Sequence, residues 1–208
     1  MKNIAFDLGN VIVRVDFGPF INEWRTQGLQ TEESCDDFFS DLQGQQDLGL
    51  TTVARALKER FRLNKDRIAS LTDAWDEAIT VSEVMAEFLQ QLKDEGHRIA
   101  ILSNIGTEHA ALMRRKFPKI FDGCILHLSC EVGARKPTKL FFQSFMLEHP
   151  EFKDAPFIDD LPENLKRGGD YDLNGFKFDL LEFEQMDVKK QTQVMKLLQE
   201  HLYIDYSN

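Results

Sequence analysis

Asp7 is the first residue of the chain whose type and position suit it to chemistry. It follows Ile4, Ala5 and Phe6, a short apolar run that predicts a strand buried on both faces, and it precedes a Gly-Asn turn. In open α/β sheets, ligands bind beyond the carboxyl ends of such strands. The position suits a nucleophilic carboxylate, although an aspartate in a turn can also serve only to bond nearby backbone.

Three further motifs place polar side chains at comparable positions. They are Ser103 and Asn104 after the apolar stretch 98–102, Arg135 and Lys136 before a proline, and Asp159 and Asp160 after the apolar stretch 156–158. Two adjacent carboxylates repel each other, and a divalent cation is the usual remedy. Lys136 would act as a mobile cation beside them. Taken one at a time, these residues also suit a helix cap, a solvated surface cation and a turn.

The periodicity of apolar residues divides the chain into two kinds of structure. Between Asp16 and Thr80 only helical patterns occur, and they predict a small helical bundle without strands. Its helices are expected at 19–26, 31–42 with Thr31 as the cap, 51–61 and 64–79.

After Ser82, helical and strand patterns alternate, which predicts a parallel sheet with crossover helices. Strands are expected at 98–103, 124–128, 156–159 and 175–179, and helices at 83–95, 108–116, 138–148, 162–168 and 187–201. In the last helix, Val194, Leu197 and Leu198 form the expected apolar side. The predicted fold class is therefore α/β, a central parallel sheet flanked by helices, with an all-helical insert.

The composition restricts the function classes. With 208 residues, 42% hydrophobic and 29% charged, the chain is typical of a soluble globular protein. A net charge of −10 argues against nucleic acid or a membrane as partner, because phosphate-rich surfaces bind clustered Lys and Arg. Cys35, Cys124 and Cys130 lack metal-ligand spacing and suit reduced thiols. With no visible signal peptide or membrane span, we expect a cytoplasmic protein. The sequence indicates no oligomeric state.

The order and spacing of the four motifs resemble the haloacid dehalogenase (HAD) superfamily, whose motifs are matched by Asp7, Ser103, Lys136 and the Asp159-Asp160 pair. The stretches 6–13, 102–104 and 135–137 resemble the bacterial alpha-D-glucose-1-phosphate phosphatase subgroup most. The resemblance covers about residues 3–180. It implies a Rossmann-like core domain of residues 1–15 and 81–208. Residues 16–80 would form a C1-type helical cap domain, which closes over the site and helps to select the substrate.

The resemblance also implies a chemistry, that of a Mg²⁺-dependent phosphatase of small phosphorylated metabolites, with sugar phosphates as the leading class. Asp7 would attack phosphorus and form an aspartyl-phosphate. The cofactor Mg²⁺ would be held by Asp7, the carbonyl of Gly9 and Asp160. Ser103 and Asn104 would contact the phosphate, and Lys136 would neutralise charge on phosphate and nucleophile. Two residues, Asp159 and Asn164, would orient either metal-bound waters or Lys136.

Gly9 departs from the family pattern. The family carries a second aspartate there, two residues after the nucleophile, which protonates the leaving group and later activates water. General acid-base catalysis contributes ~10²- to 10⁴-fold, so either another residue replaces it or turnover of poor leaving groups is slow. Asp16, close in sequence, is one candidate replacement. Gly9 itself suits a positive φ.

Two other functions stay open. A metal-independent 2-haloacid dehalogenase also lacks the second acid, because halide leaves unprotonated, but such relatives do not carry the Asp-Asp pair. A non-catalytic pseudoenzyme that binds a phosphorylated ligand would explain Gly9, although the nucleophile, the lysine and the metal acids are intact.

Aromatic and histidine side chains leave further alternatives. Trp24, Phe38, Phe39 and Trp75 suit either the wall of a pocket or the core of the helical bundle. The five histidines lie in no recognisable nucleophile-base motif, so we expect them at the surface or at helix ends.

Overall fold

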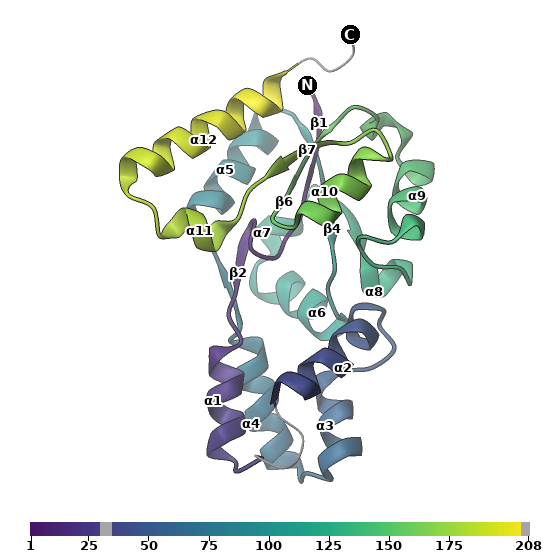
Figure 1. Ribbon diagram of the computed structural model, residues 1–208, viewed down its shortest axis with the longest axis vertical. Helices are drawn as coiled ribbons and strands as arrows, with labels where there is room; N and C mark the ends of the chain where they lie inside the picture. Colours follow the sequence, from purple (N-terminus) through teal and green to yellow (C-terminus); the bar gives the residue numbers. More distant parts are fainter. Residues whose placement is uncertain (30–34, 205–208) are drawn as a thin grey trace.

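The protein, seen in a computed structural model that describes residues 1–29 and 35–204, is built on a five-stranded parallel sheet (Figure 1). The strand order is β5 (Ile125–Leu128), β4 (Arg98–Ser103), β1 (Asn3–Phe6), β6 (Pro156–Asp159) and β7 (Asn174–Lys177). The predicted parallel sheet is confirmed. Because all five strands run the same way, the residues that follow them share one sheet edge.

Side chains alternate between the two faces of the sheet, and helices cover both faces. Ile4, Phe6 and Ile101 pack on one face, whereas Ala5 and Phe157 pack on the other, as the two-residue repeat of a strand requires. The first face is covered by α5 (Glu83–Asp94), α6 (Thr107–Lys116), α7 (Pro118–Phe121), α11 (Leu180–Glu184) and α12 (Val188–Tyr203). The second is covered by α9 (Lys139–Glu148), the 3₁₀ turn η1 (Pro150–Phe152) and α10 (Pro162–Gly169). Burial on both faces explains why these strands read as uninterrupted apolar runs.

The terminal helix α12 meets the core along a narrower stripe than expected. Leu198 and Leu202 are buried, and Val194 packs against the same cluster, but Leu197 is 48% exposed. The prediction for Leu197 is wrong, because residue 197 lies about 100° around the helix from residue 198.

Four helices form a separate cluster at the carboxyl edge of the sheet (Figure 1). They are α1 (Gly18–Thr26), α2 (Cys35–Asp47), α3 (Val53–Phe61) and α4 (Lys65–Asp76), and we call them the helical bundle. The side chains of Thr52 and Asn64 cap α3 and α4 by accepting backbone N–H bonds. The predicted helical insert is therefore present, while the predicted Thr31 cap lies outside the described residues.

Two strands connect the bundle to the sheet. Val13–Val15 (β2) pairs antiparallel with Ile79–Val81 (β3), with Val13 opposite Val81 and Val15 opposite Ile79. The expectation that the fourth helix reaches Ile79 and that no strand occurs between Asp16 and Thr80 is wrong, because β3 begins at Ile79. Three-residue strands are too short to impose a visible periodicity, and the strand partner of β3 lies more than 60 residues earlier in the sequence.

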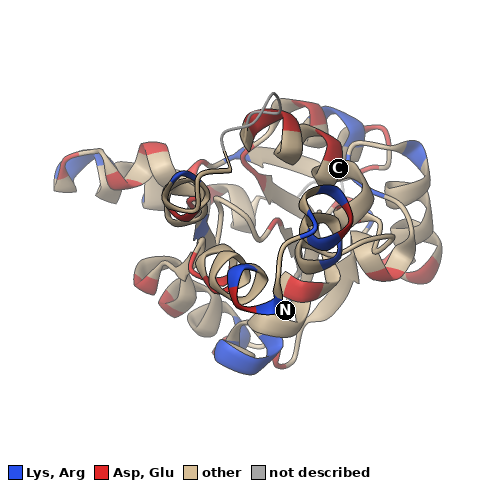
Figure 2. Cartoon of the chain, turned by 90° about the horizontal axis from the view of Figure 1, so that it is seen from below, with Lys and Arg blue, Asp and Glu red and all other residues tan. Residues whose placement is uncertain are grey.

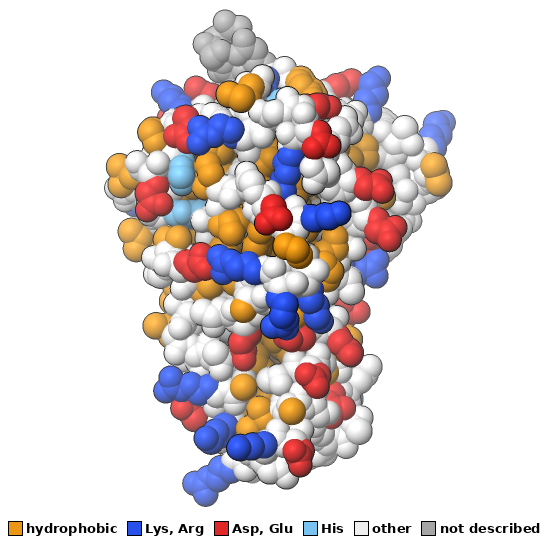
Figure 3. Space-filling model, turned by 180° about the vertical axis from the view of Figure 1, so that it is seen from behind, with side chains coloured by type: hydrophobic (Ala, Val, Ile, Leu, Met, Phe, Trp, Pro, Cys, Tyr) orange, Lys and Arg blue, Asp and Glu red, His pale blue; other side chains and the backbone are white. Residues whose placement is uncertain are grey.

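The surface carries charges of both signs, interspersed over the faces in Figures 2 and 3. Within residues 1–29 and 35–204, no helix is both long and apolar enough to cross a membrane. The short helix α8 (Ser129–Val132) completes the elements that surround the site.

Candidate active site

Asp7 lies directly after β1, the central strand, and is held by contacts with Leu8, Ile158 and Lys136. Its N–H donates to the Ile158 carbonyl at 2.7 Å. Its Oδ1 accepts a 2.6 Å hydrogen bond from the Leu8 N–H and lies 2.9 Å from Lys136 Nζ. Both contacts use Oδ1. The other oxygen, Oδ2, takes part in neither contact.

Lys136 is a fixed, buried cation. Its side chain is 1% exposed, and its Nζ lies 2.9 Å from Asp7 Oδ1 and 2.6 Å from Asp159 Oδ2. Burial alone would lower the pKa of this ammonium group, but the two carboxylates outweigh burial and raise it. Lys136 is therefore charged, and the expectation of a mobile or solvated side chain is wrong because two carboxylates hold it.

Asp159 and Asn164 form the support of Lys136. Asp159 is fully buried, and its Oδ1 accepts hydrogen bonds from Leu161 N–H and Asn164 Nδ2, both at 2.9 Å. Its Oδ2 is left for Lys136. Of the two roles open for this pair, the contacts favour orientation of Lys136.

Ser103 and Asn104 end β4 beside the lysine. The Asn104 side chain donates to the Lys136 carbonyl at 2.9 Å and accepts from the Lys136 N–H at 2.8 Å, so it fixes the backbone that carries the ammonium group. Ser103 is 2% exposed and lines the cavity described below. The phosphate contacts predicted for both residues stay predictions.

Asp160 completes a cluster of acids with Asp7 and Asp159, in which one oxygen from each residue lies within 4.8 Å of the others. Burial, with the charges of the neighbouring acids, raises the pKa of Asp7 to about 7, although Lys136 opposes the shift. Burial and Asp159 likewise raise the pKa of Asp160 to about 6. One ammonium group does not compensate three carboxylates, and this oxygen-rich, undercompensated set fits a hard divalent cation.

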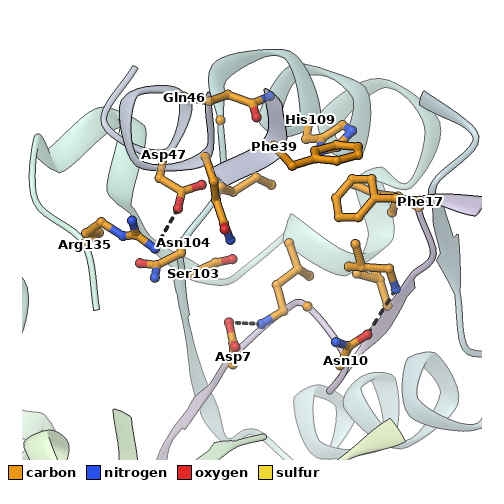
Figure 4. Close-up of a pocket in the computed structure, with 18 of the residues that line it drawn as sticks. Asp7, Asn10, Phe17, Phe39, Gln46, Asp47, Ser103, Asn104, His109 and Arg135 are labelled. Carbon is orange, nitrogen blue, oxygen red and sulfur yellow. Dashed lines mark hydrogen bonds and ion pairs between the residues drawn. The ribbon is translucent and has the colours of Figure 1, made fainter. Parts of the chain in front are cut away.

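A cavity of about 620 Å³ opens above Asp7, between the sheet edge and the helical bundle (Figure 4). The core contributes the predicted residues Asp7, Gly9, Ser103, Asn104, Lys136 and Asp160, together with His109 and Arg135. The bundle side contributes Phe17, Ile21, Asp36, Phe39, Gln43, Gln46, Asp47 and Trp75. The structure thus brings the predicted residues together, with Asp159 and Asn164 buried behind them.

This geometry matches known structures, although no protein-family model matches the sequence. A HAD family enzyme of Bacteroides thetaiotaomicron superposes with a TM-score of 0.77 at 22% identity, covering 92% of this chain and 98% of that chain. A predicted HAD-like family hydrolase of Porphyromonas gingivalis superposes with a TM-score of 0.67 at 21% identity, covering 94% of this chain and 98% of that chain. For a HAD phosphatase of Thermococcus onnurineus the TM-score is 0.59 at 18% identity, with 84% of this chain and 85% of that chain covered. The chain has the HAD fold.

Within this HAD fold, the aromatic residues of the insert divide between the two roles expected for them. Trp24 and Phe38 are buried in the core of the bundle, whereas Phe39 and Trp75 line the cavity. Trp75 stacks on His109 with ring centroids 5.1 Å apart, and burial lowers the pKa of that histidine. His109 and His127 are buried, so the surface prediction is wrong for both.

Gly9 and Asp16 bear on the missing acid of the HAD pattern. Gly9 has no positive φ, contrary to expectation, since the left-handed residue of this turn is Asn10, with φ 51°. A Cβ on Gly9 would lie 3.5 Å from Val15 Cγ2, an ordinary contact. Asp16 lies outside the described lining of the cavity, and its Oδ1 accepts the Gly18 N–H at 2.8 Å. It is therefore not placed to replace the acid.

Sequence reasoning missed Gln46, Asp47 and Arg135 as cavity residues. The motif that contains Lys136 could have pointed to Arg135, which stands beside it. Gln46 and Asp47 had no such signal, because they lie in a polar run without apolar periodicity. Helix α2 extends five residues beyond its predicted end at Leu42, and those residues reach the cavity. Only the packing of the bundle against the core reveals them.

Proposed function

We propose that the protein is a Mg²⁺-dependent phosphatase of small phosphorylated metabolites that acts through an aspartyl-phosphate on Asp7. The observation that carries the proposal is the charge arrangement at the end of β1. A buried aspartate contacts a buried lysine and belongs to a cluster of three acids, all beside a cavity large enough for a metabolite. Phosphoryl transfer needs a positioned nucleophile and compensation of negative charge.

In this proposal, Asp7 Oδ2 attacks phosphorus while the bond from phosphorus to the ester oxygen breaks. The leaving oxygen takes a proton from water and departs as an alcohol. A second water then attacks phosphorus, the bond from phosphorus to Asp7 Oδ2 breaks, and phosphate and free Asp7 are released. Lys136 neutralises charge on the nucleophile and on the phosphoryl oxygens, and Ser103 donates a hydrogen bond to one of those oxygens. The fixed position of Lys136 supports this role, because catalytic charges stabilise best when they need no reorganisation.

Asp7, Asp160 and the Gly9 carbonyl are the groups that would hold Mg²⁺. When bound, the ion would offset the repulsion between the carboxylates and an incoming phosphate. The raised pKa values of Asp7 and Asp160 support a cation at this place. The Bacteroides thetaiotaomicron enzyme, which shares the fold, has been solved in complex with magnesium and inorganic phosphate.

Sugar phosphates are the leading substrate class in this proposal, and a screen of phosphorylated metabolites with and without Mg²⁺ tests it. We expect phosphate release from sugar phosphates only when Mg²⁺ is present. Release of halide from 2-haloacids without metal would instead establish the dehalogenase function. Phosphate release that is unchanged by EDTA would contradict the metal site.

The metal-free protein should lose thermal stability as pH rises from about 5 to 8. The folded pKa of Asp7 is about 7, against 3.8 for an ordinary aspartate. Between those values the folded protein binds more protons than the unfolded chain, so the free energy of unfolding falls as pH rises, by up to ~3 kcal/mol from pH 5 to 8. The pKa of Asp160, about 6, adds to the same trend.

Thermal denaturation at the two pH values, with and without Mg²⁺, measures this dependence. Mg²⁺ should raise the melting temperature more at pH 8, where the acids are ionised, because binding stabilises the folded state. The Asp7→Asn variant, which cannot titrate at this position, is the control and should show a flatter profile. An Asp7→Asn profile as steep as that of the wild-type protein would contradict the assignment.

A further inference from the structure

The last turn of α2 brings two polar side chains into the cavity above Asp7. Gln46 and Asp47 are only 4% and 6% exposed, although both are polar. The turn packs closely on the core. A Cβ on Gly106, in the loop after Ser103, would lie 2.5 Å from Gln46 Cγ, so a side chain there would displace Gln46. Gln46 thus packs against the loop that follows the predicted phosphate-binding residues.

Buried atoms of both side chains lack a hydrogen bond. Within the described residues, neither Gln46 Nε2 nor Asp47 Oδ2 has a hydrogen-bond partner. Asp47 Oδ2 is ion-paired with Arg135 at 3.3 Å, which leaves the Gln46 amide as the group without any partner. Buried polar groups in folded proteins are almost always hydrogen-bonded. An unpartnered amide in the lining of this cavity therefore indicates a polar ligand group.

The Gln46 amide and the Asp47 carboxylate are complementary to hydroxyl groups. An amide N–H donates and a carboxylate oxygen accepts, while a hydroxyl group can do both at once. Burial raises the pKa of Asp47 to about 6, against the opposing charge of Arg135, so above this pH the side chain is mostly an ionised acceptor. Gln46 can therefore donate to a hydroxyl oxygen, and Asp47 can accept from a hydroxyl group.

The wall beside this pair is aromatic. Phe17 and Phe39 both stack on Trp75, with ring centroids 4.7 Å and 5.3 Å apart, and Trp75 stacks on His109. Figure 4 shows Phe17, Phe39 and His109 on one side of the cavity and Asp47 with Arg135 on the other. A ligand that fits both sides has a C–H face and a hydroxyl edge, which is the chemistry of a sugar ring or cyclic polyol.

We propose that Gln46 and Asp47 bind hydroxyl groups of the substrate's leaving group and thereby select polyhydroxylated phosphates. This inference rests on the proposed phosphatase function and names the residues that choose its substrate. It predicts an effect on binding rather than on the reaction itself, because neither residue is assigned to the reacting atoms.

The test is competition against hydrolysis of p-nitrophenyl phosphate, which has no hydroxyl group on its ring. Hexose phosphates should inhibit the wild-type protein more strongly than cyclohexyl phosphate, a ring of the same size without hydroxyl groups. Gln46→Leu and Asp47→Asn should each raise the inhibition constants of the hexose phosphates about 10- to 100-fold. The constant for cyclohexyl phosphate and the turnover of p-nitrophenyl phosphate should change less than about threefold in both variants.

Gln45→Leu and Asp41→Asn are matched controls, because both residues are exposed on the same helix, and they should change no constant. Equal inhibition of the wild-type protein by hexose phosphates and by cyclohexyl phosphate would overturn the inference. A variant that raises both inhibition constants by the same factor would also overturn it. A loss of p-nitrophenyl phosphate turnover in well-folded Asp47→Asn would place Asp47 at the reacting atoms instead. Failure of the wild-type protein to hydrolyse p-nitrophenyl phosphate with Mg²⁺ would refute the phosphatase function itself.

Discussion

Replacing Asp7 by asparagine should reduce Mg²⁺-dependent hydrolysis of p-nitrophenyl phosphate by ~10³-fold or more, since removal of a covalent nucleophile removes the reaction path itself. Asparagine has the same shape, and its Oδ1 can still accept from Leu8 N–H and Lys136 Nζ, which Asp7 Oδ1 contacts now. The variant should therefore fold. Steady-state rates of phosphate release measure the loss.

Two comparisons make this result specific to the site. Asp160→Asn should also abolish activity, because it removes a predicted metal ligand, whereas Asp122→Asn, at an exposed acid remote from the cavity, should retain full activity. The metal-free Asp7→Asn protein should also melt at a higher temperature than wild type at pH 8, since the buried group at position 7 no longer has to ionise. Retained activity in Asp7→Asn would refute the nucleophile.

Sequence alone located the core of the candidate site because that core depends on local signals. Short apolar runs predicted the strands, and β6 matches its expected bounds of 156–159. Once the strands are parallel, Asp7, Ser103 and Asp160 must lie at neighbouring strand ends. The topology, rather than any detail of the side chains, brings those residues together.

The parts that sequence did not predict depend on contacts between distant segments. The burial of Lys136 requires Asp159 and Asn104, which lie 23 and 32 residues away. The placement of Gln46 and Asp47 requires α2 to pack on the loop after Ser103, and no periodicity in α2 signals that contact. Such contacts between distant residues depend on the folded structure and leave no local pattern in the sequence.

p-Nitrophenyl phosphate should give a burst of nitrophenolate approaching one equivalent of enzyme in pre-steady-state measurements. The reason is Gly9, which leaves the site without the local acid and base of the HAD pattern. Nitrophenolate departs readily without a proton, so the aspartyl-phosphate forms quickly. Water must then attack it without a base at this position, and this second step is slow. A sugar alkoxide leaves poorly, so the first step should depend steeply on the pKa of the leaving group.

Gly9→Asp should speed hydrolysis of the trapped intermediate by about 10²-fold, because general acid-base catalysis contributes on that order or more. The substitution is sterically open, since Gly9 has no positive φ and its Cβ would meet only Val15 Cγ2 at 3.5 Å. Gly9→Asn is the matched control, equal in size but unable to move a proton, and it should leave the burst unchanged. A wild-type protein that shows no burst and hydrolyses aryl and alkyl phosphates equally fast would mean that another carboxyl group lining the cavity, Asp36 or Asp47, already supplies the acid and base.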